Sequence, residues 1–296
     1  MDRIKNMKQG LSLHLTGTIF RVALLCLGMV GWQLPLRAAT PIATPSSPTT
    51  ATPAPANTAA PPPVLLEFVK NLDAAASRKD LGAAMQYFSA NLTHSDGLDN
   101  KTYSEALKAF WQNTPSVQYQ TQIDSWQLQG PNQYLMETTT TIRGVQKAAE
   151  RDMTLESTVR SRTTIIDQKI TNQTILSEQT RLSAGDKAPN VQINLPEQVT
   201  VGQSFNFDAI VKDPLGEDLL LGAALEESVT PDRYLQPAAV TLEPLSAGGL
   251  FKIGKAPQQP GRKWISAILI QSSGMAIVSQ RLNVVPSNSA ASPSSR

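Results

Sequence analysis

The sequence predicts an α+β domain, with three helices packed on a curved antiparallel sheet, followed by an all-β sandwich. Three observations support this prediction. Apolar residues recur every three to four positions between residues 64 and 111, which is the spacing of amphipathic helices. From residue 116 the chain is rich in Thr, Val, Ile and Tyr, with turn residues between the runs. From residue 186 it divides into short strand-like segments with frequent turns.

The start of the chain has the order of a secretory signal. Basic residues precede an apolar run over residues 22–36, and small residues follow at Ala38 and Ala39. This run is shorter than the roughly 20 residues that a membrane-spanning helix needs. The alternative is that this segment is not cleaved and anchors the protein in a membrane. Contact with a membrane is expected only in that case. We therefore expect an exported protein that works in a periplasm, a thylakoid lumen or the extracellular space.

Composition and charge exclude several kinds of chemistry. Removal of residues 1–39 takes away Cys26 and His14, so the mature chain would have no cysteine and would keep only His94. Thiol catalysis is then excluded, and neither a metal site nor a cofactor is expected. The 26 Lys and Arg nearly balance the 24 Asp and Glu, so a nucleic-acid partner is not expected either.

Changes in composition along the chain divide it into five segments. They are a signal peptide (1–39), a disordered linker rich in Pro, Thr and Ala (40–63), the α+β domain (64–185), the sandwich (186–286) and a disordered tail (287–296). The linker has no charge and no apolar periodicity, so it cannot bury a core of its own. It is therefore expected to act as a spacer.

Three helices are expected before the sheet begins. The first carries apolar residues from Leu65 to Ala76 at helical spacing. Asp80 is the expected N-cap of the second, whose apolar face would extend to Phe88. Thr102 and Glu105 have the pattern of a capping box at the start of the third. Residues 91–100 are rich in turn formers and are expected to be a loop.

Four long strands are expected at residues 116–129, 133–145, 152–167 and 170–181. In the third strand the apolar residues fall on one face, and Glu156, Arg160 and Arg162 fall on the other. One face should therefore pack, while the other meets water or a partner. A bulge near Asp124 would bring the apolar residues of the first strand to one face. Residues 145–153 could instead be helical.

The order of three short helices and a curved sheet resembles the NTF2-like (SnoaL-like) cone family. The residues that carry the resemblance are Ala76-Ser77-Arg78-Lys79-Asp80-Leu81, Met85, Phe88 and Thr93-His94-Ser95-Asp96. The resemblance implies a pocket between the helices and the concave sheet, and a homodimer through the sheet. The family includes isomerases, dehydratases, binding modules and dimerisation modules, so the fold does not choose the function.

Residues 186–286 resemble Ig-like modules of secreted bacterial proteins, without the cysteine pair of antibody domains. The strand-like segments lie near residues 191–195, 204–211, 218–226, 239–243, 250–253, 263–271 and 275–284. Gln271-Ser272-Ser273-Gly274 is expected to join the last two as a hairpin. Trp264 is expected in the core, and residues 219–225 could alternatively form a helix.

His94, Asp96, Tyr119 and Asp124 are the candidate site residues. His94 follows the second helix, at the expected pocket mouth, and Asp96 lies two residues away, so the histidine could act as a base or contact a ligand. A solvated loop histidine is the favoured alternative. An isomerase would need a carboxylate base and oxyanion donors, for which Asp124 with Tyr119 or Tyr134 is the available set. Solvent exposure is the favoured alternative for Asp124.

A second candidate surface consists of Arg143, Arg160 and Arg162, which project from one face of the expected sheet. They could pair with Glu137 and Glu156 across the strands, which is the favoured interpretation. The alternative is a surface for a protein partner or for a second copy of the chain.

These observations favour an exported, non-catalytic binding or scaffold protein of the cell envelope. Its partner would be a protein or a small apolar ligand, with His94, Asp96 and Tyr119 as ligand contacts. One alternative is an extracytoplasmic enzyme, like an isomerase or a dehydratase, that acts on a small molecule. Another is an accessory of cell-wall assembly, since NTF2-like modules also occur beside transpeptidase domains.

Overall fold

The computed structural model describes residues 60–148, 151–214, 218–234, 240–245 and 248–287. The predicted signal peptide, most of the linker and nearly all of the tail lie outside these residues. The helices are α1 (Pro63–Ser77), α2 (Leu81–Met85), α3 (Asn100–Gln112) and the short 3-10 helix η1 (Pro231–Tyr234). None of the described helices has the length and apolar character needed to cross a membrane.

The strands are β1 (Phe88–His94), β2 (Ser116–Gly130), β3 (Gln133–Ala148), β4 (Arg151–Ile166), β5 (Lys169–Ala184), β6 (Val191–Asn194), β7 (Gln198–Thr200), β8 (Ser204–Val211), β9 (Leu220–Ser228), β10 (Glu243–Leu245), β11 (Gly249–Lys255), β12 (Gly261–Gln271) and β13 (Gly274–Val285). Within the described residues, ten of them form one sheet in the order β10-β9-β12-β13-β5-β4-β3-β2, with β1 beside β5 and β7 beside β13. A smaller sheet has the order β11-β8-β6.

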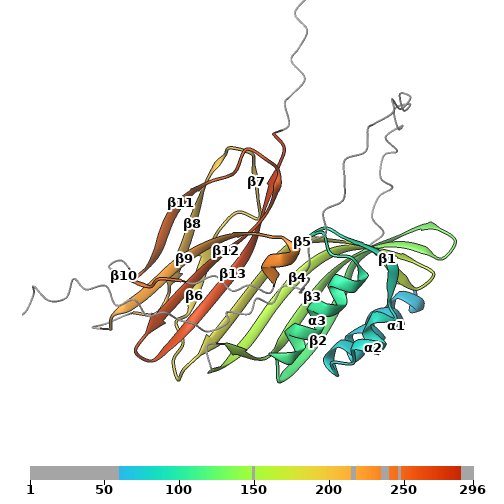
Figure 1. Ribbon diagram of the computed structural model, residues 1–296, viewed down its shortest axis with the longest axis horizontal. Helices are drawn as coiled ribbons and strands as arrows, with labels where there is room; N and C mark the ends of the chain where they lie inside the picture. The colour runs from blue at the N-terminus through green and yellow to red at the C-terminus, as the bar shows by residue number, and fades with distance from the viewer. Residues whose placement is uncertain (1–59, 149–150, 215–217, 235–239, 246–247, 288–296) are drawn as a thin grey trace, which may run out of the picture.

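The large sheet is covered by helices at one end and by the small sheet at the other (Figure 1). The alternation along β12 shows that these covers lie on opposite faces. Trp264 and Ile268 join the core beneath the helices, whereas Ile265 and Leu269 join the core beneath the small sheet. Because successive side chains of a strand point to opposite faces, β12 is buried on both.

The predicted fold class, a three-helix cone domain plus a separate Ig-like sandwich, is wrong. The described chain is mostly strand, and its two halves share one large antiparallel sheet. They join where residues 179–184 of β5 pair with residues 275–280 of β13. A free β5 edge would expose a row of unpaired backbone groups; β13 covers its second half, and β1 pairs with residues 170–173 near its start.

The junction also requires glycine. Gly185 has a φ of +99°, and a Cβ placed on it would lie 2.5 Å from the Gly274 Cα and from the Ser273 carbonyl oxygen. A side chain here would therefore push β5 away from the turn that leads into β13.

The segment between the second and third helices differs from the prediction. Helix α2 ends at Met85, and Phe88 begins the strand β1 instead of extending the helix. Parallel pairing of β1 with β5 determines this outcome, with Phe88 opposite Ile170. The expected loop at residues 91–100 is therefore partly strand. Helix α3 starts with a capping box formed by Asp99 and Thr102, so the predicted cap at Thr102 and Glu105 is wrong.

The four long strands are confirmed as β2 to β5. The pairing of β2 with β3 shifts between Ile123 and Ser125, which confirms the predicted bulge. Strands β3 and β4 extend through the described residues of 145–153, so the helical alternative for this segment is wrong. The helical alternative for residues 219–225 is also wrong, because β9 occupies them. Trp264 is buried, as predicted.

Candidate functional site

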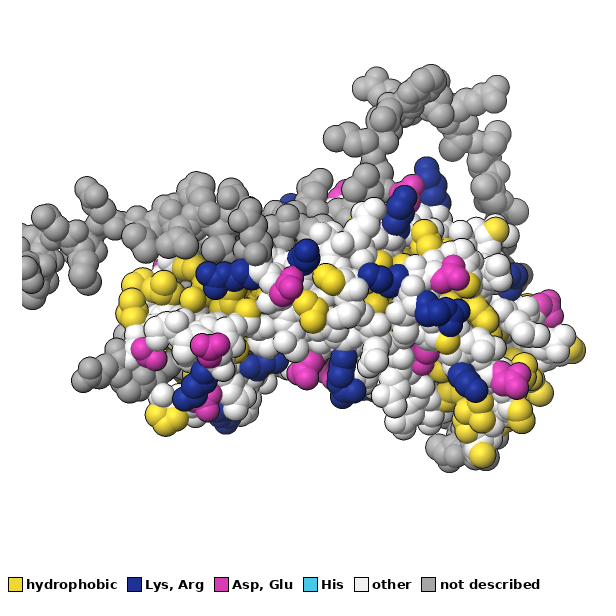
Figure 2. Space-filling model, turned by 90° about the horizontal axis from the view of Figure 1, so that it is seen from below, with side chains coloured by type: hydrophobic (Ala, Val, Ile, Leu, Met, Phe, Trp, Pro, Cys, Tyr) yellow, Lys and Arg dark blue, Asp and Glu magenta, His cyan; other side chains and the backbone are white. Residues whose placement is uncertain are grey.

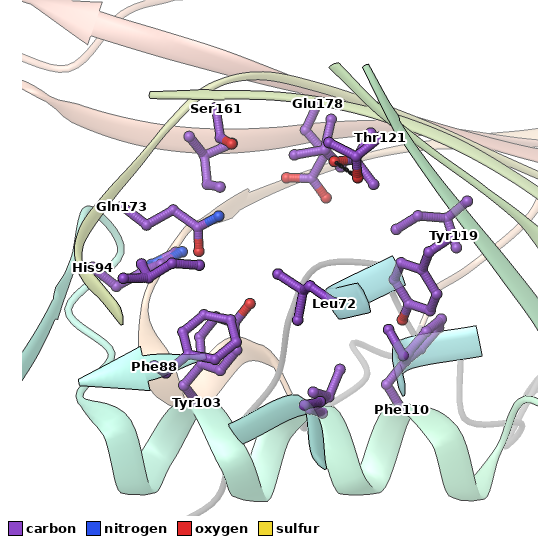
Figure 3. A pocket seen from close by; sticks show the side chains of 18 of the residues that line it. Leu72, Phe88, His94, Tyr103, Phe110, Tyr119, Thr121, Ser161, Gln173 and Glu178 are labelled. Atoms are coloured by element: carbon purple, nitrogen blue, oxygen red, sulfur yellow. Dashed lines mark hydrogen bonds between the residues drawn. The ribbon is translucent and has the colours of Figure 1, made fainter. Parts of the chain in front are cut away.

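A cavity of about 130 Å³ lies between the helices and the sheet face that they cover. Most of its lining is apolar, with Phe88 from β1, Leu107 and Phe110 from α3, and Ile142 and Ile175 from the sheet. Figure 3 shows side chains converging on it from α1 and α3 on one side and from the strands on the other. Tyr234 and Arg281, from the second half of the chain, also line it, so both halves build this site.

His94 and Gln173 place two unpartnered polar atoms at one end of the cavity. His94 is 7% exposed, and its Nδ1 accepts the backbone N–H of Asp96 at 3.2 Å. In the neutral imidazole the proton is therefore on Nε2. Neither His94 Nε2 nor Gln173 Oε1 has a hydrogen-bond partner among the described residues, although both are buried. These two atoms are thus one unused donor and one unused acceptor on residues that line the cavity.

His94 is held in its uncharged form. Burial lowers the pKa of His94 to about 4; Asp96 opposes this shift, and the charges of Arg281 and Arg262 add to it. The imidazole therefore offers a neutral N–H donor at physiological pH.

We expect acid to destabilise the protein between pH 6.5 and pH 4 through His94. The unfolded chain protonates this imidazole near its ordinary pKa of 6.5, whereas the folded protein does so only near 4. The unfolded state binds more protons in this window, so the free energy of unfolding should fall by about 3 kcal/mol as the pH drops across it. Urea unfolding at several pH values measures the fall, and His94→Asn should lack it. An equal fall in both proteins would assign the acid effect to other groups.

A buried ion cluster lies beside the same end of the cavity. Arg281 donates from Nη1 and Nη2 to the two carboxylate oxygens of Asp96, each at 2.9 Å. Its Nε and Nη2 also donate to Glu178 Oε2, at 3.2 Å and 2.8 Å. The Tyr234 hydroxyl donates to Asp96, and Trp264 Nε1 donates to Glu178 Oε2 at 3.1 Å. Through these hydrogen bonds, Arg281 connects β13 to the loop after β1 and also to β5.

The two carboxylates respond differently to this setting. Burial alone would raise the pKa of Asp96, but the charge and hydrogen bonds of Arg281 hold that pKa below its usual value. Burial raises the pKa of Glu178, and Arg281 offsets only part of the increase. Asp96 is therefore the firmly ionised partner of Arg281.

The polar groups at the other end of the cavity have partners. Tyr119 Oη accepts the indole N–H of Trp111 at 3.0 Å. Thr121 Oγ1 lies 2.7 Å from Asp73 Oδ1 and 2.9 Å from Thr140 Oγ1. Tyr119, Thr121 and Asp73 thus bond within the protein, whereas His94 Nε2 and Gln173 Oε1 have no partner among the described residues.

The structure brings some of the predicted site residues together and separates others. His94 is buried, so its interpretation as a solvated loop residue is wrong. Tyr119 lines the cavity, whereas Asp96 lies behind His94 and faces Arg281. Asp124 is exposed and accepts a hydrogen bond from Thr139 Oγ1 at 2.7 Å, away from Tyr119 and the cavity. Tyr134 borders a different pocket beside α1.

The arginine surface lies on the opposite face of the large sheet. Arg143, Arg160 and Arg162 are all exposed there, and Arg162 pairs with Glu137 at 2.6 Å, as expected. On the face seen in Figure 2, basic and acidic side chains are interspersed, and hydrophobic side chains gather towards the two ends.

The sequence prediction missed Gln173, Glu178, Tyr234 and Arg281. Glu178 carried a usable signal, because it is a charged residue at the same parity as Thr180 and Leu182 in an alternating stretch of β5, and charged residues are almost never fully buried without a partner. Arg281 carried less, because β13 is buried on both faces and does not alternate. Gln173 and Tyr234 carried none. Among the described residues, no three His, Cys, Asp or Glu side chains are grouped to hold a metal ion.

A family model described as a domain of unknown function, DUF8623, matches residues 186–285. The comparison with curated proteins found no match. Three solved structures are similar to parts of the chain, at identities of 10–17%.

One is Bd1075 of Bdellovibrio bacteriovorus, with 14% identity and a TM-score of 0.28 over 38% of this chain and 40% of that one. The chain thus matches less than half of the length of Bd1075. Another is an NTF2-like protein of unknown function from Cytophaga hutchinsonii, with 10% identity and a TM-score of 0.23 over 37% of this chain and 86% of that one. The third is an uncharacterized cystatin-fold protein from Novosphingobium aromaticivorans, with 17% identity and a TM-score of 0.26 over 37% of this chain and 95% of that one.

Proposed function

We propose that the protein is a non-catalytic binding protein that holds a small, mainly apolar molecule between its helices and its sheet. The observation that carries this proposal is the largely apolar cavity lined by His94 and Gln173, whose Nε2 and Oε1 atoms are buried and have no partner among the described residues. Buried polar atoms in proteins are almost always hydrogen-bonded. A bound molecule with a polar group would satisfy both atoms.

The size and charge of the cavity limit the ligand. Its volume of about 130 Å³ is close to that of engineered apolar cavities that bind benzene. Arg281 is already paired with Asp96 and Glu178, and Asp73 at the other end of the cavity accepts hydrogen bonds from the backbone N–H and the hydroxyl group of Thr121. A charged ligand would have to break one of these pairings or enter without a counter-charge, at a large desolvation cost, so the ligand is uncharged.

The chemistry of the polar groups favours binding over catalysis. His94 Nε2 carries the imidazole proton, so it acts as a donor and not as a base. Asp96 and Glu178 are held by Arg281, and Asp124 lies on the surface. The secretory order of residues 1–39 supports a ligand that is met outside the cytoplasm.

Filling the cavity tests this proposal. Val159 lines the cavity on β4, while its neighbour Thr158 is exposed on the opposite face of the same strand. Val159→Phe should abolish saturable binding of toluene, and Thr158→Phe should leave it unchanged. Binding is measured by titration calorimetry and by the rise in Tm, because a ligand present at a hundred times its Kd stabilises a protein by about 2.7 kcal/mol. Failure of toluene and phenol to bind the wild-type protein, or full binding by Val159→Phe, would refute the proposal.

A further inference from the structure

We infer that the molecule bound in the cavity carries one uncharged hydroxyl group, as an alcohol or a phenol, which His94 and Gln173 recognise together. This inference rests on the proposed binding function and adds the chemical class of the ligand. Two buried atoms of opposite hydrogen-bonding character carry it, namely His94 Nε2–H and Gln173 Oε1.

The strand register brings these two side chains to the same place. His94 on β1 lies opposite Gln173 on β5 in the parallel pairing of the two strands. Residues directly opposite one another in a sheet share a face, and both side chains point into the cavity (Figure 3). They nevertheless make no hydrogen bond with each other, since both atoms are unpartnered among the described residues.

The direction of the His94 donor is fixed by its surroundings. Nδ1 accepts the Asp96 backbone N–H, and the Asp96 side chain is held in turn by Arg281 and Tyr234. The imidazole ring also contacts the Tyr103 ring, with centroids 5.8 Å apart. The ring therefore cannot turn to satisfy Nε2 elsewhere without breaking a buried contact.

A hydroxyl group is the smallest neutral group that meets both requirements. Its oxygen accepts the N–H of His94 while its proton is donated to Gln173 Oε1. A ketone or an ether only accepts, so it would leave Gln173 Oε1 unsatisfied in the orientation found. A purely apolar molecule would leave both atoms unsatisfied, and each buried unsatisfied group costs about 1–3 kcal/mol.

Phenol and toluene form the decisive pair of ligands, because they have nearly the same size and differ by a hydroxyl in place of a methyl group. On the full chain, we expect phenol to bind about 10- to 100-fold more tightly than toluene. Anisole, which can accept from His94 but cannot donate to Gln173, should bind less tightly than phenol. Titration calorimetry at pH 7.5, where phenol is uncharged, gives the three Kd values.

Two variants assign the preference to the two side chains. Gln173→Leu removes the acceptor, and His94→Asn removes the donor while its amide oxygen can still accept the Asp96 N–H. Each should reduce the preference for phenol over toluene to about threefold or less. Gln179→Leu, on the exposed face of the same strand, is the matched control and should keep the wild-type ratio.

The outcomes separate this inference from the proposed function. If toluene and phenol bind wild-type protein equally well, or if anisole binds as tightly as phenol, the hydroxyl inference is wrong while the binding function stands. If the ratio survives in both variants, the recognition lies elsewhere and the inference is again wrong. If no ligand binds, the proposed function itself fails. Should one variant fail to fold, the wild-type ratios and the other variant still decide.

Discussion

Replacing Arg281 by methionine is expected to destabilise the protein by about 3–5 kcal/mol, because Asp96 and Glu178 would then be buried without a counter-charge. The Arg281 side chain is 1% exposed, so water cannot take over its role. Methionine has a similar volume, which limits the contribution from lost packing. Urea unfolding of wild type and variant at pH 7 measures the difference.

Arg160→Met is the matched control, because Arg160 is exposed on the outer face of β4. It should change the free energy of unfolding by no more than about 0.5 kcal/mol. Adding Glu178→Met to Arg281→Met should recover part of the loss, since one of the two uncompensated charges is removed. Equal effects of Arg281→Met and Arg160→Met would show that the buried cluster contributes nothing specific to stability.

The long strands of the first half are predictable from the sequence because their signal is local. In β4 the buried residues Met153, Leu155 and Ile165 alternate with the exposed residues Glu156 and Arg162, and this period is visible without any knowledge of the neighbouring strands. Short turns then make β3, β4 and β5 antiparallel neighbours.

The single shared sheet could not be predicted in the same way. Nothing in the sequence of β5 specifies that its second edge pairs with β13, since that contact depends on how the second half folds back. The prediction for the segment that forms β1 was wrong for a related reason. Its first residue, Phe88, fits the helical spacing of Leu81 and Met85, and only the pairing with β5 makes it a strand.

The candidate site was predictable only in part. His94 stands out in the sequence because a mature chain would contain no other histidine. Its surroundings come from other elements of the fold, including the Tyr103 ring on α3 and the charge of Arg281 on β13. Gln173 is one polar residue among many in a Thr- and Gln-rich strand. Only its position opposite His94 in the sheet identifies it as a candidate site residue.

Separating the two halves is the second change with a large expected effect: residues 60–185 alone should fail to unfold cooperatively. The fragment would lose the β13 pairing along β5, and Asp96 and Glu178 would lose Arg281. It would also lose Tyr234 and Arg281 from the cavity lining. Thermal unfolding followed by circular dichroism tests the fragment, which is expected to show a broad transition or to aggregate through its free edge.

Co-expression of residues 60–185 with residues 186–287 is the control, because a complex of the two restores every contact across β5 and β13. That complex should unfold cooperatively and bind phenol as the intact chain does. The opposite result is also informative: if residues 60–185 alone unfold cooperatively and bind phenol with the affinity of the full chain, the shared sheet and the Arg281 cluster are dispensable for the site. The cavity would then belong to the first half only, and the second half would be free to serve a separate purpose.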